Sequence, residues 1–179
     1  ALAHQQEHAI EVLLPMLRYR LGPLPVLPLV VGQMTPEALL ELLLPLLDQY
    51  TLLVISSDLS HYLSYREAQA QDTLTLAQIL ALDASLQPEQ ACGHTAINMA
   101  LLLSRKRMLL PALVGQHNSG DVTGELDARI YPGEFISGDR GATGGAVSFH
   151  GVNGVNDRKI RIYGLSELHQ HPGEILDLR

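Results

Sequence analysis

An acid and an imidazole lie three residues apart just after an apolar run in the middle of the chain. Residues 51–55 form the run, and Asp58 and His61 follow in the polar cluster that ends at Tyr62. An imidazole gives or takes a proton near neutral pH, and the spacing lets the two side chains share one site. In the structural alternative, Asp58 caps the helix that starts near Ser64, and His61 is an ordinary loop residue.

A second polar cluster opens the chain, from His4 to His8, and Glu11 follows it. On a helix, His4 and His8 lie on one face about one turn apart. The pattern H-x-x-E-H is that of the inverted zinc peptidases, in which two imidazoles bind zinc and Glu7 would activate water. That site needs a distant third ligand, for which Glu89 is well spaced. The alternative is a solvated first turn with acids near the amino end of the helix.

Two further clusters follow later in the sequence. Cys92-Gly93-His94 stands at the start of an apolar helix, where a single cysteine is most often a small core residue. If imidazoles face it, the helix amino end would help to hold a thiolate. Residues 118–121, Asn-Ser-Gly-Asp, follow a predicted strand and would share a sheet edge with Asp58 if the two strands are parallel. The alternative for them is a polar turn.

The elements that must position these residues alternate between strands and helices, which predicts a layered α/β fold. The uninterrupted apolar run indicates a central strand covered on both faces, with its polar end where α/β sheets bind ligands. We expect Pro15 to bend or end the first helix, and Pro45 weakens the end of the second. We predict helices over 4–20, 35–48, 64–82 and 88–104, strands over 27–32, 51–57, 108–114, 146–149 and 159–163, and a loop over 125–145. The third helix should bury one side, carrying Ala68, Leu74, Ile79 and Leu82.

Composition limits the classes of function. The chain has 179 residues, a net charge of -7 and 12 Lys and Arg, with no basic run longer than Arg105–Arg107. This argues against binding to nucleic acid or to an anionic membrane, and no apolar stretch is long enough to span a bilayer. The single cysteine excludes an internal disulfide and suits a reducing compartment, so we expect a cytoplasmic protein. The chain begins at Ala1 without a signal-peptide pattern, and we expect that it was cut from a longer polypeptide.

Taken together, the four clusters closely resemble the Memo family, the bacterial, archaeal and eukaryotic relatives of the mediator of ErbB2-driven cell motility. Four motifs in the order of that family carry the resemblance: Glu7–Pro15, Ser56–Tyr62, Cys92–Ile97 and Asn118–Asp121. We therefore predict a Memo-like α/β domain over residues 1–124, truncated at its amino end, and an unassigned divergent tail over 125–179. Residues 145–149 are a faint echo of the strand that closes the family's domain.

The resemblance implies a three-layer α/β/α sandwich like that of the class III extradiol dioxygenases, with its N-terminal part missing. It also implies a metal held by two imidazoles and a thiolate. Carried over by position, His8 is one imidazole ligand and Cys92 the thiolate, and Asp58 and His61 lie beside the metal with His61 as acid or base. The other imidazole belongs to a family segment that would precede Ala1. Fe(II) is the expected metal, Cu or Zn also suits these ligands, and two ligands alone should bind it weakly.

The implied function is a metal-dependent oxidoreductase with an unknown substrate. The main alternative is a non-catalytic protein that binds a peptide or another ligand on the same scaffold, and the inverted zinc peptidase is a remote one. The resemblance also implies a small-molecule or peptide ligand and a pathway shared with a radical-SAM protein.

Overall fold

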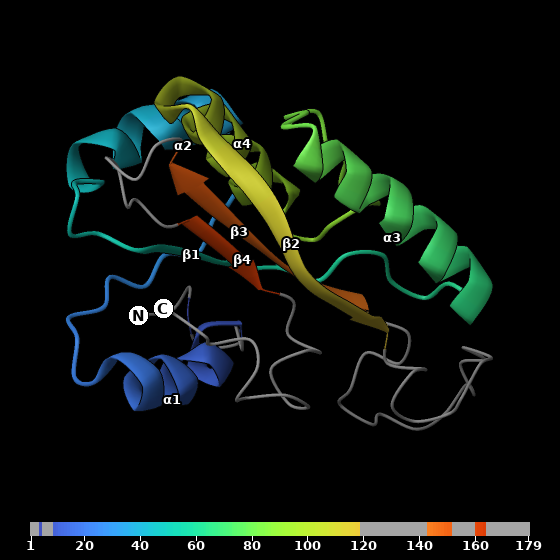
Figure 1. The fold of residues 1–179 in the computed structure, drawn as a ribbon, viewed down its shortest axis with the longest axis horizontal. Coiled ribbons are helices and arrows are strands. Elements are labelled where there is room, and N and C mark those ends of the chain that lie inside the picture. The colour runs from blue at the N-terminus through green and yellow to red at the C-terminus, as the bar shows by residue number, and fades with distance from the viewer. Residues whose placement is uncertain (1–3, 5–8, 119–142, 152–159, 164–179) are drawn as a thin grey trace.

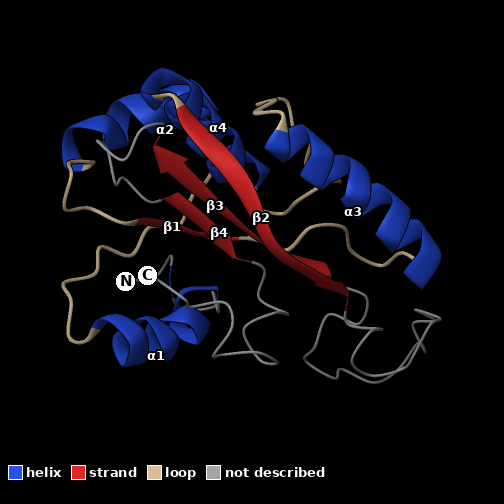
Figure 2. Ribbon diagram, viewed as in Figure 1, coloured by secondary structure: helices blue, strands red, loops and turns tan. Residues whose placement is uncertain are grey.

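The computed structural model describes residue 4 and residues 9–118, 143–151 and 160–163, which form a mixed α/β fold (Figure 1). Two helices precede each of the first two strands, because the strand predicted between the first two helices does not form among the described residues, and two more strands follow (Figure 2). The elements in chain order are α1 (Ala9–Leu21), α2 (Pro36–Leu43), the 3-10 turn η2 (Leu44–Leu46), β1 (Leu53–Ser56), α3 (Tyr65–Leu80), α4 (His94–Arg107), β2 (Leu109–Asn118), β3 (Thr143–Gly151) and β4 (Ile160–Tyr163).

The four described strands form one mixed sheet in the order β1-β4-β3-β2. β1 and β4 are parallel, whereas β3 is antiparallel to both β4 and β2. It follows that β1 and β2 run in the same direction, so their carboxyl ends lie at the same edge of the sheet. The prediction that Asn118 and Asp58 share a sheet edge depended on these two strands being parallel, and this condition is confirmed. Residues 119–121 of that motif lie outside the described residues.

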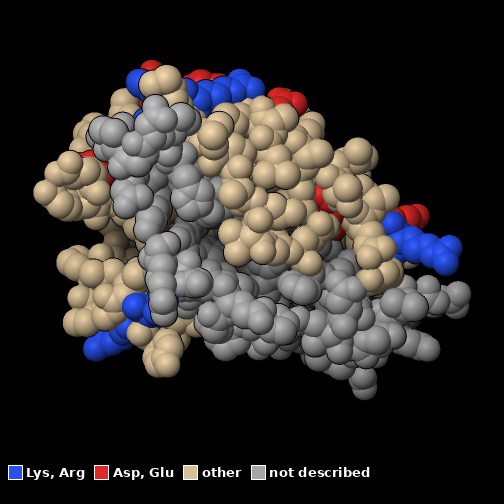
Figure 3. All heavy atoms as spheres, in the orientation of Figure 1, with Lys and Arg blue, Asp and Glu red and all other residues tan. Residues whose placement is uncertain are grey.

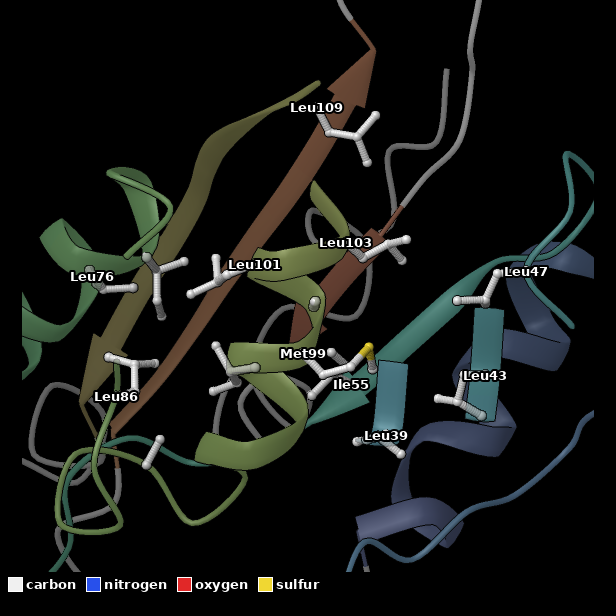
Figure 4. Close-up of a cluster of buried hydrophobic side chains, with 14 of the residues drawn as sticks. Leu39, Leu43, Leu47, Ile55, Leu76, Leu86, Met99, Leu101, Leu103 and Leu109 are labelled. Atoms are coloured by element: carbon white, nitrogen blue, oxygen red, sulfur yellow. The ribbon is translucent and has the colours of Figure 1, made fainter. Parts of the chain in front are cut away.

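The hydrophobic core lies between the sheet and the helices α2, α3 and α4. Figure 4 shows Leu39 and Leu43 of α2 turned toward Ile55 of β1 and Met99 of α4. All four side chains are at most 6% exposed. Burial of each such side chain contributes about 1.5–3 kcal/mol, so this cluster is what fixes β1 against the helices.

Local sequence explains where the helices begin. Thr35 caps α2 by accepting a hydrogen bond of 3.2 Å from the amide of Ala38, and Pro36 occupies the first turn. Helix α2 ends before Pro45, which cannot donate to the helix. Helix α3 begins at the capping box of Ser64 and Glu67. Helix α1 continues through Pro15 to Leu21, so of the two expected effects of this proline, ending the helix does not occur.

The predicted strand over residues 27–32 does not form in the described structure. No hydrogen bond joins residues 24–32 to any other described residue, because no described strand lies beside them. Pro28 also removes one donor from the middle of the segment. Its apolar side chains stay exposed, from 36% for Val31 to 66% for Leu27.

β1 lies at an edge of the described sheet and not at its centre, so that part of the prediction was wrong. Only β4 pairs with it among the described strands. The apolar run reflects contacts of its two faces: Ile55 enters the core, and α1 lies close to β1 apart from the other helices (Figure 1). An apolar sequence reports buried faces and does not specify how many strands flank the segment.

The buried face of α3 differs from the predicted one. Ala68 and Ile79 are buried as predicted, but Leu74 is 65% exposed. Asp72 and Thr75 take its place on the inner face at helical spacing, because their polar atoms find hydrogen bonds there. Hydrophobicity alone therefore assigned the wrong residue to the core.

Helix α4 begins at His94, later than the start predicted at Pro88, and residues before it form turns. The strand candidate 146–149 is confirmed as part of β3, and residues 160–163 of the candidate 159–163 form β4, whereas residue 159 lies outside the described residues. Residues 143–145 belong to β3 and not to the predicted loop. Within the described part of the chain, no helix combines the length and apolarity needed to cross a bilayer. The face in Figure 3 carries scattered acidic and basic side chains without one large patch of either sign.

Candidate functional site

The strand-end loop, residues 57–63, carries the predicted acid and imidazole directly after β1. Asp58 is 5% exposed, and its Oδ2 atom lies 3.9 Å from Nε2 of His61, whose side chain is 23% exposed. That distance is too long for a direct hydrogen bond but close enough for electrostatic attraction when the imidazole is protonated. The two side chains therefore lie close together, as their spacing predicted.

The structural alternative for Asp58 was a helix cap, and the structure contradicts it. Helix α3 is capped by Ser64, whose amide and hydroxyl both donate to the carboxylate of Glu67, at 3.1 and 2.6 Å. These hydrogen bonds lower the pKa of Glu67 below its ordinary value. Asp58 is thus not needed to start the helix.

The Cys92 thiol lies against the main chain of the acid. The Cys92 amide donates to the carbonyl oxygen of Asp58 over 3.3 Å, and Sγ lies 3.7 Å from the same oxygen. Sγ also lies 3.6 Å from Oγ of Ser57. The thiol is exposed, so the alternative of a small core residue was wrong. An exposed thiol at a strand end is open to a ligand.

Ser57 and Gly93 join the start of α4 to the end of β1 through a hydrogen bond. Neither residue was assigned a role from the sequence. The Gly93 amide donates to Oγ of Ser57 over 2.8 Å, and this hydroxyl donates to the Asp58 carbonyl over 2.9 Å. A Cβ atom on residue 93 would lie 2.6 Å from Cβ of Ser57, which real structures do not tolerate. The glycine between Cys92 and a helix was the available signal, because a close backbone approach often needs glycine.

His94 does not join the acid and the thiol. Its Nδ1 atom is buried and has no hydrogen-bond partner, and Nε2 lies 3.3 Å from Oγ1 of the adjacent Thr95. Among the described residues, the polar contacts of the Cys92 sulfur are with Ser57 and Asp58 and not with an imidazole. His8 falls outside the described residues, so its role as a ligand stays a prediction.

The described residues contain no group of three or more His, Cys, Asp or Glu side chains placed to hold a metal ion. Of the residues of the zinc-peptidase alternative, His4 and Glu89 are both exposed, and Glu7 and His8 lie outside the described residues. What the described site offers is one open thiol, one acid and one imidazole around the end of β1. An imidazole such as that of His61 can give or take a proton near neutral pH.

Comparison of the sequence with known proteins identifies a family. A family model described as Memo-like protein matches residues 1–131. A MEMO1 family protein of Archaeoglobus fulgidus is 27% identical over 145 residues, which are 74% of this chain and 56% of that protein. One of Methanosarcina mazei is 33% identical over 144 residues, covering 72% of this chain and 54% of that protein.

The chain spans about half the length of the curated relatives it matches. No solved structure matches it. The family match covers residues 1–131, which include the strand-end loop and Cys92. The chain therefore belongs to the Memo-like family.

Proposed function

We propose that Cys92 and His8 supply two ligands of a non-haem metal site, with Fe(II) as the metal, and that Asp58 and His61 lie beside it. The observation that carries this proposal is that Sγ of the exposed Cys92 lies 3.7 Å from the carbonyl oxygen of Asp58. Asp58 belongs to the same loop as His61. Membership in the Memo-like family supports the choice of ligands. The whole protein would then be a metal-dependent oxidoreductase.

The donor chemistry fits such a metal. A thiolate and an imidazole suit Fe(II), Cu(I) and Zn, and the exposed position of Cys92 leaves its sulfur accessible. When bound, the metal would supply Lewis acidity and, for iron or copper, a redox centre. The neighbouring residues have their own tasks: His61 would give or take a substrate proton at Nε2, and the Asp58 carboxylate would stabilise the protonated ring.

We also propose a layered architecture, a class of substrate, a cellular location and a pathway partner. The described sheet with α2, α3 and α4 would be part of a three-layer α/β/α sandwich like that of the class III extradiol dioxygenases. The substrate is a small molecule or a peptide, and the protein acts in the cytoplasm in a pathway shared with a radical-SAM protein. Family resemblance and the single cysteine support these statements.

Anaerobic titration of the 179-residue chain with Fe(II) tests the ligands. We expect weak binding, because two protein ligands hold iron less firmly than three. Cys92→Ser and His8→Ala should each abolish it, whereas His4→Ala, four residues before His8 in the sequence, should leave it unchanged. Tight binding of one equivalent that survives His8→Ala would show that the ligands are wrong.

Oxygen uptake tests turnover separately. With Fe(II) and a panel of catechols, a metal-dependent oxidoreductase consumes oxygen, and His61→Ala lowers the rate by about 10²–10⁴-fold if the imidazole moves a proton. Uptake should be measured on the chain and on the full-length Methanosarcina mazei relative. A flat trace with both proteins would favour the alternative of a non-catalytic binding protein.

A further inference from the structure

The carboxylate of Asp72, in the middle of α3, accepts a hydrogen bond from the strand-end loop. Asp72 and Ser60 are both 0% exposed, and the Ser60 amide donates to Oδ1 of Asp72 over 2.9 Å. Ser60 lies between the two residues of the proposed site, Asp58 and His61. Asp72 is twelve residues away in sequence, so this hydrogen bond joins a rigid helix to a loop that carries polar chemistry.

Burial of this carboxylate is costly for the fold, so its presence needs an explanation. Charged groups are almost never fully buried unless they are paired. In the described structure Oδ2 of Asp72 and Oγ of Ser60 have no hydrogen-bond partner. An apolar residue, such as Leu76 and Ile79 on the same buried face, would stabilise the core more. Among the described residues, the hydrogen bond that Asp72 makes and an apolar residue cannot make is the one from the Ser60 amide.

That bond lies where small shifts would matter most. The Asp58 and His61 side chains are 3.9 Å apart, at the outer limit of an ion pair, and the residue after His61, Tyr62, has a left-handed backbone with φ 60°. A loop with a residue in that conformation relies on surrounding contacts to keep its shape. Fixing the Ser60 amide removes freedom from the loop between the acid and the imidazole.

We propose that Asp72 is a positioning residue that sets the geometry of Asp58 and His61 by holding the amide of Ser60. The proposal rests on the proposed function only in taking this pair as the functional one. Asp72 does not touch substrate or metal; it acts through the loop.

The test measures the loop directly, without metal or substrate. In the unaltered protein, NMR should detect a scalar coupling across the hydrogen bond between the Ser60 amide nitrogen and the Asp72 carboxyl carbon. Asp72→Ala should speed hydrogen exchange of the Ser60 amide about 10- to 100-fold, the range expected for a bond to a charged group. It should also change the imidazole nitrogen shifts of His61, which report its tautomer and hydrogen bonding.

Two further variants separate positioning from general loss of structure. Asp72→Asn keeps an acceptor oxygen and should retain the Ser60 protection and the His61 shifts. Thr75→Val changes an equally buried residue of α3 whose hydroxyl donates to the Gln71 carbonyl and accepts from Nε2 of Gln90. Neither partner belongs to the strand-end loop, so this variant should leave both readouts unchanged.

Absence of the coupling in the unaltered protein would overturn the proposal even if Asp72→Ala does not fold. Unchanged His61 shifts in a folded Asp72→Ala protein would overturn it too, as would an equal change in Thr75→Val. None of these results depends on iron, so they are distinct from failure of the Fe(II) titration.

Discussion

Gly93→Ala is the sharpest perturbation of the link between the thiol and the acid. Gly93 has φ -91° and ψ 22°, in the bridge region that alanine can also occupy, so the backbone does not forbid the change. The obstacle is space: the added methyl group would lie 2.6 Å from Cβ and 2.7 Å from Oγ of Ser57. Since β1 and α4 both pack into the core, the loop before α4 must move away from the strand end.

The magnitude follows from two contributions. Forcing a methyl group into a packed contact costs about 1–3 kcal/mol, and loss of the 2.8 Å hydrogen bond from the Gly93 amide to Ser57 costs about 0.5–1.5 kcal/mol. We expect the free energy of unfolding to fall by roughly 2–4 kcal/mol. The shift should also carry Cys92 away from Asp58 and so change the reactivity of the single thiol.

Urea denaturation measures the free energy of unfolding. The rate at which Cys92 reacts with a disulfide reagent measures the reactivity of the thiol. Gly32→Ala is the matched control, because a Cβ atom there meets nothing within 4 Å, and it should change stability by less than about 0.5 kcal/mol. Adding Ser57→Gly to Gly93→Ala should recover part of the loss, since the clashing atoms are gone. Stability of Gly93→Ala within 0.5 kcal/mol of the unaltered protein would refute the reasoning.

Three other expectations concern the scaffold. Asn98→Ala should lower the free energy of unfolding by about 2–4 kcal/mol in urea denaturation, because Asn98 satisfies both the amide and the carbonyl of Leu86 in a buried position; a loss below 1 kcal/mol would contradict this. The hydrogen bonds from Ser64 lower the pKa of Glu67, so its stabilisation of the fold is present above its ordinary pKa and is lost as pH falls through the lowered value. Urea midpoints measured across that pH range should therefore depend less on pH in Glu67→Gln than in the unaltered protein. An equal pH dependence in both proteins would count against the capping box. Amides of residues 24–32 should exchange with solvent within about tenfold of an unstructured peptide, whereas protection equal to that of the α4 amides would show that the segment is paired.

The sequence was informative where local chemistry decides the structure. The helix starts predicted near Thr35 and Ser64 agree with the structure, because both are fixed by capping contacts between neighbouring residues. The closeness of Asp58 and His61 also followed from their spacing within one loop. Such features need no knowledge of distant contacts.

Other features depend on partners far away in the sequence. Residues 27–32 have the composition of a strand, but a strand needs a neighbour to hydrogen-bond, and none is described. Leu74 looked like a core residue, yet Asp72 is buried near it because the Ser60 amide lies within reach. The roles of Ser57 and Gly93 likewise appear only when β1 and α4 meet, since no local pattern links residues 36 positions apart.

The central claim is that Cys92 and His8 share one metal ion beside Asp58 and His61. Co(II), which replaces Fe(II) in such sites, gives an intense near-ultraviolet band when a thiolate binds it. Anaerobic addition of excess Co(II) to the chain should produce this band, Cys92→Ser should remove it, and His8→Ala should weaken it strongly while His4→Ala does not. A band that is unchanged in His8→Ala, or bound Co(II) without any thiolate band, would contradict the account.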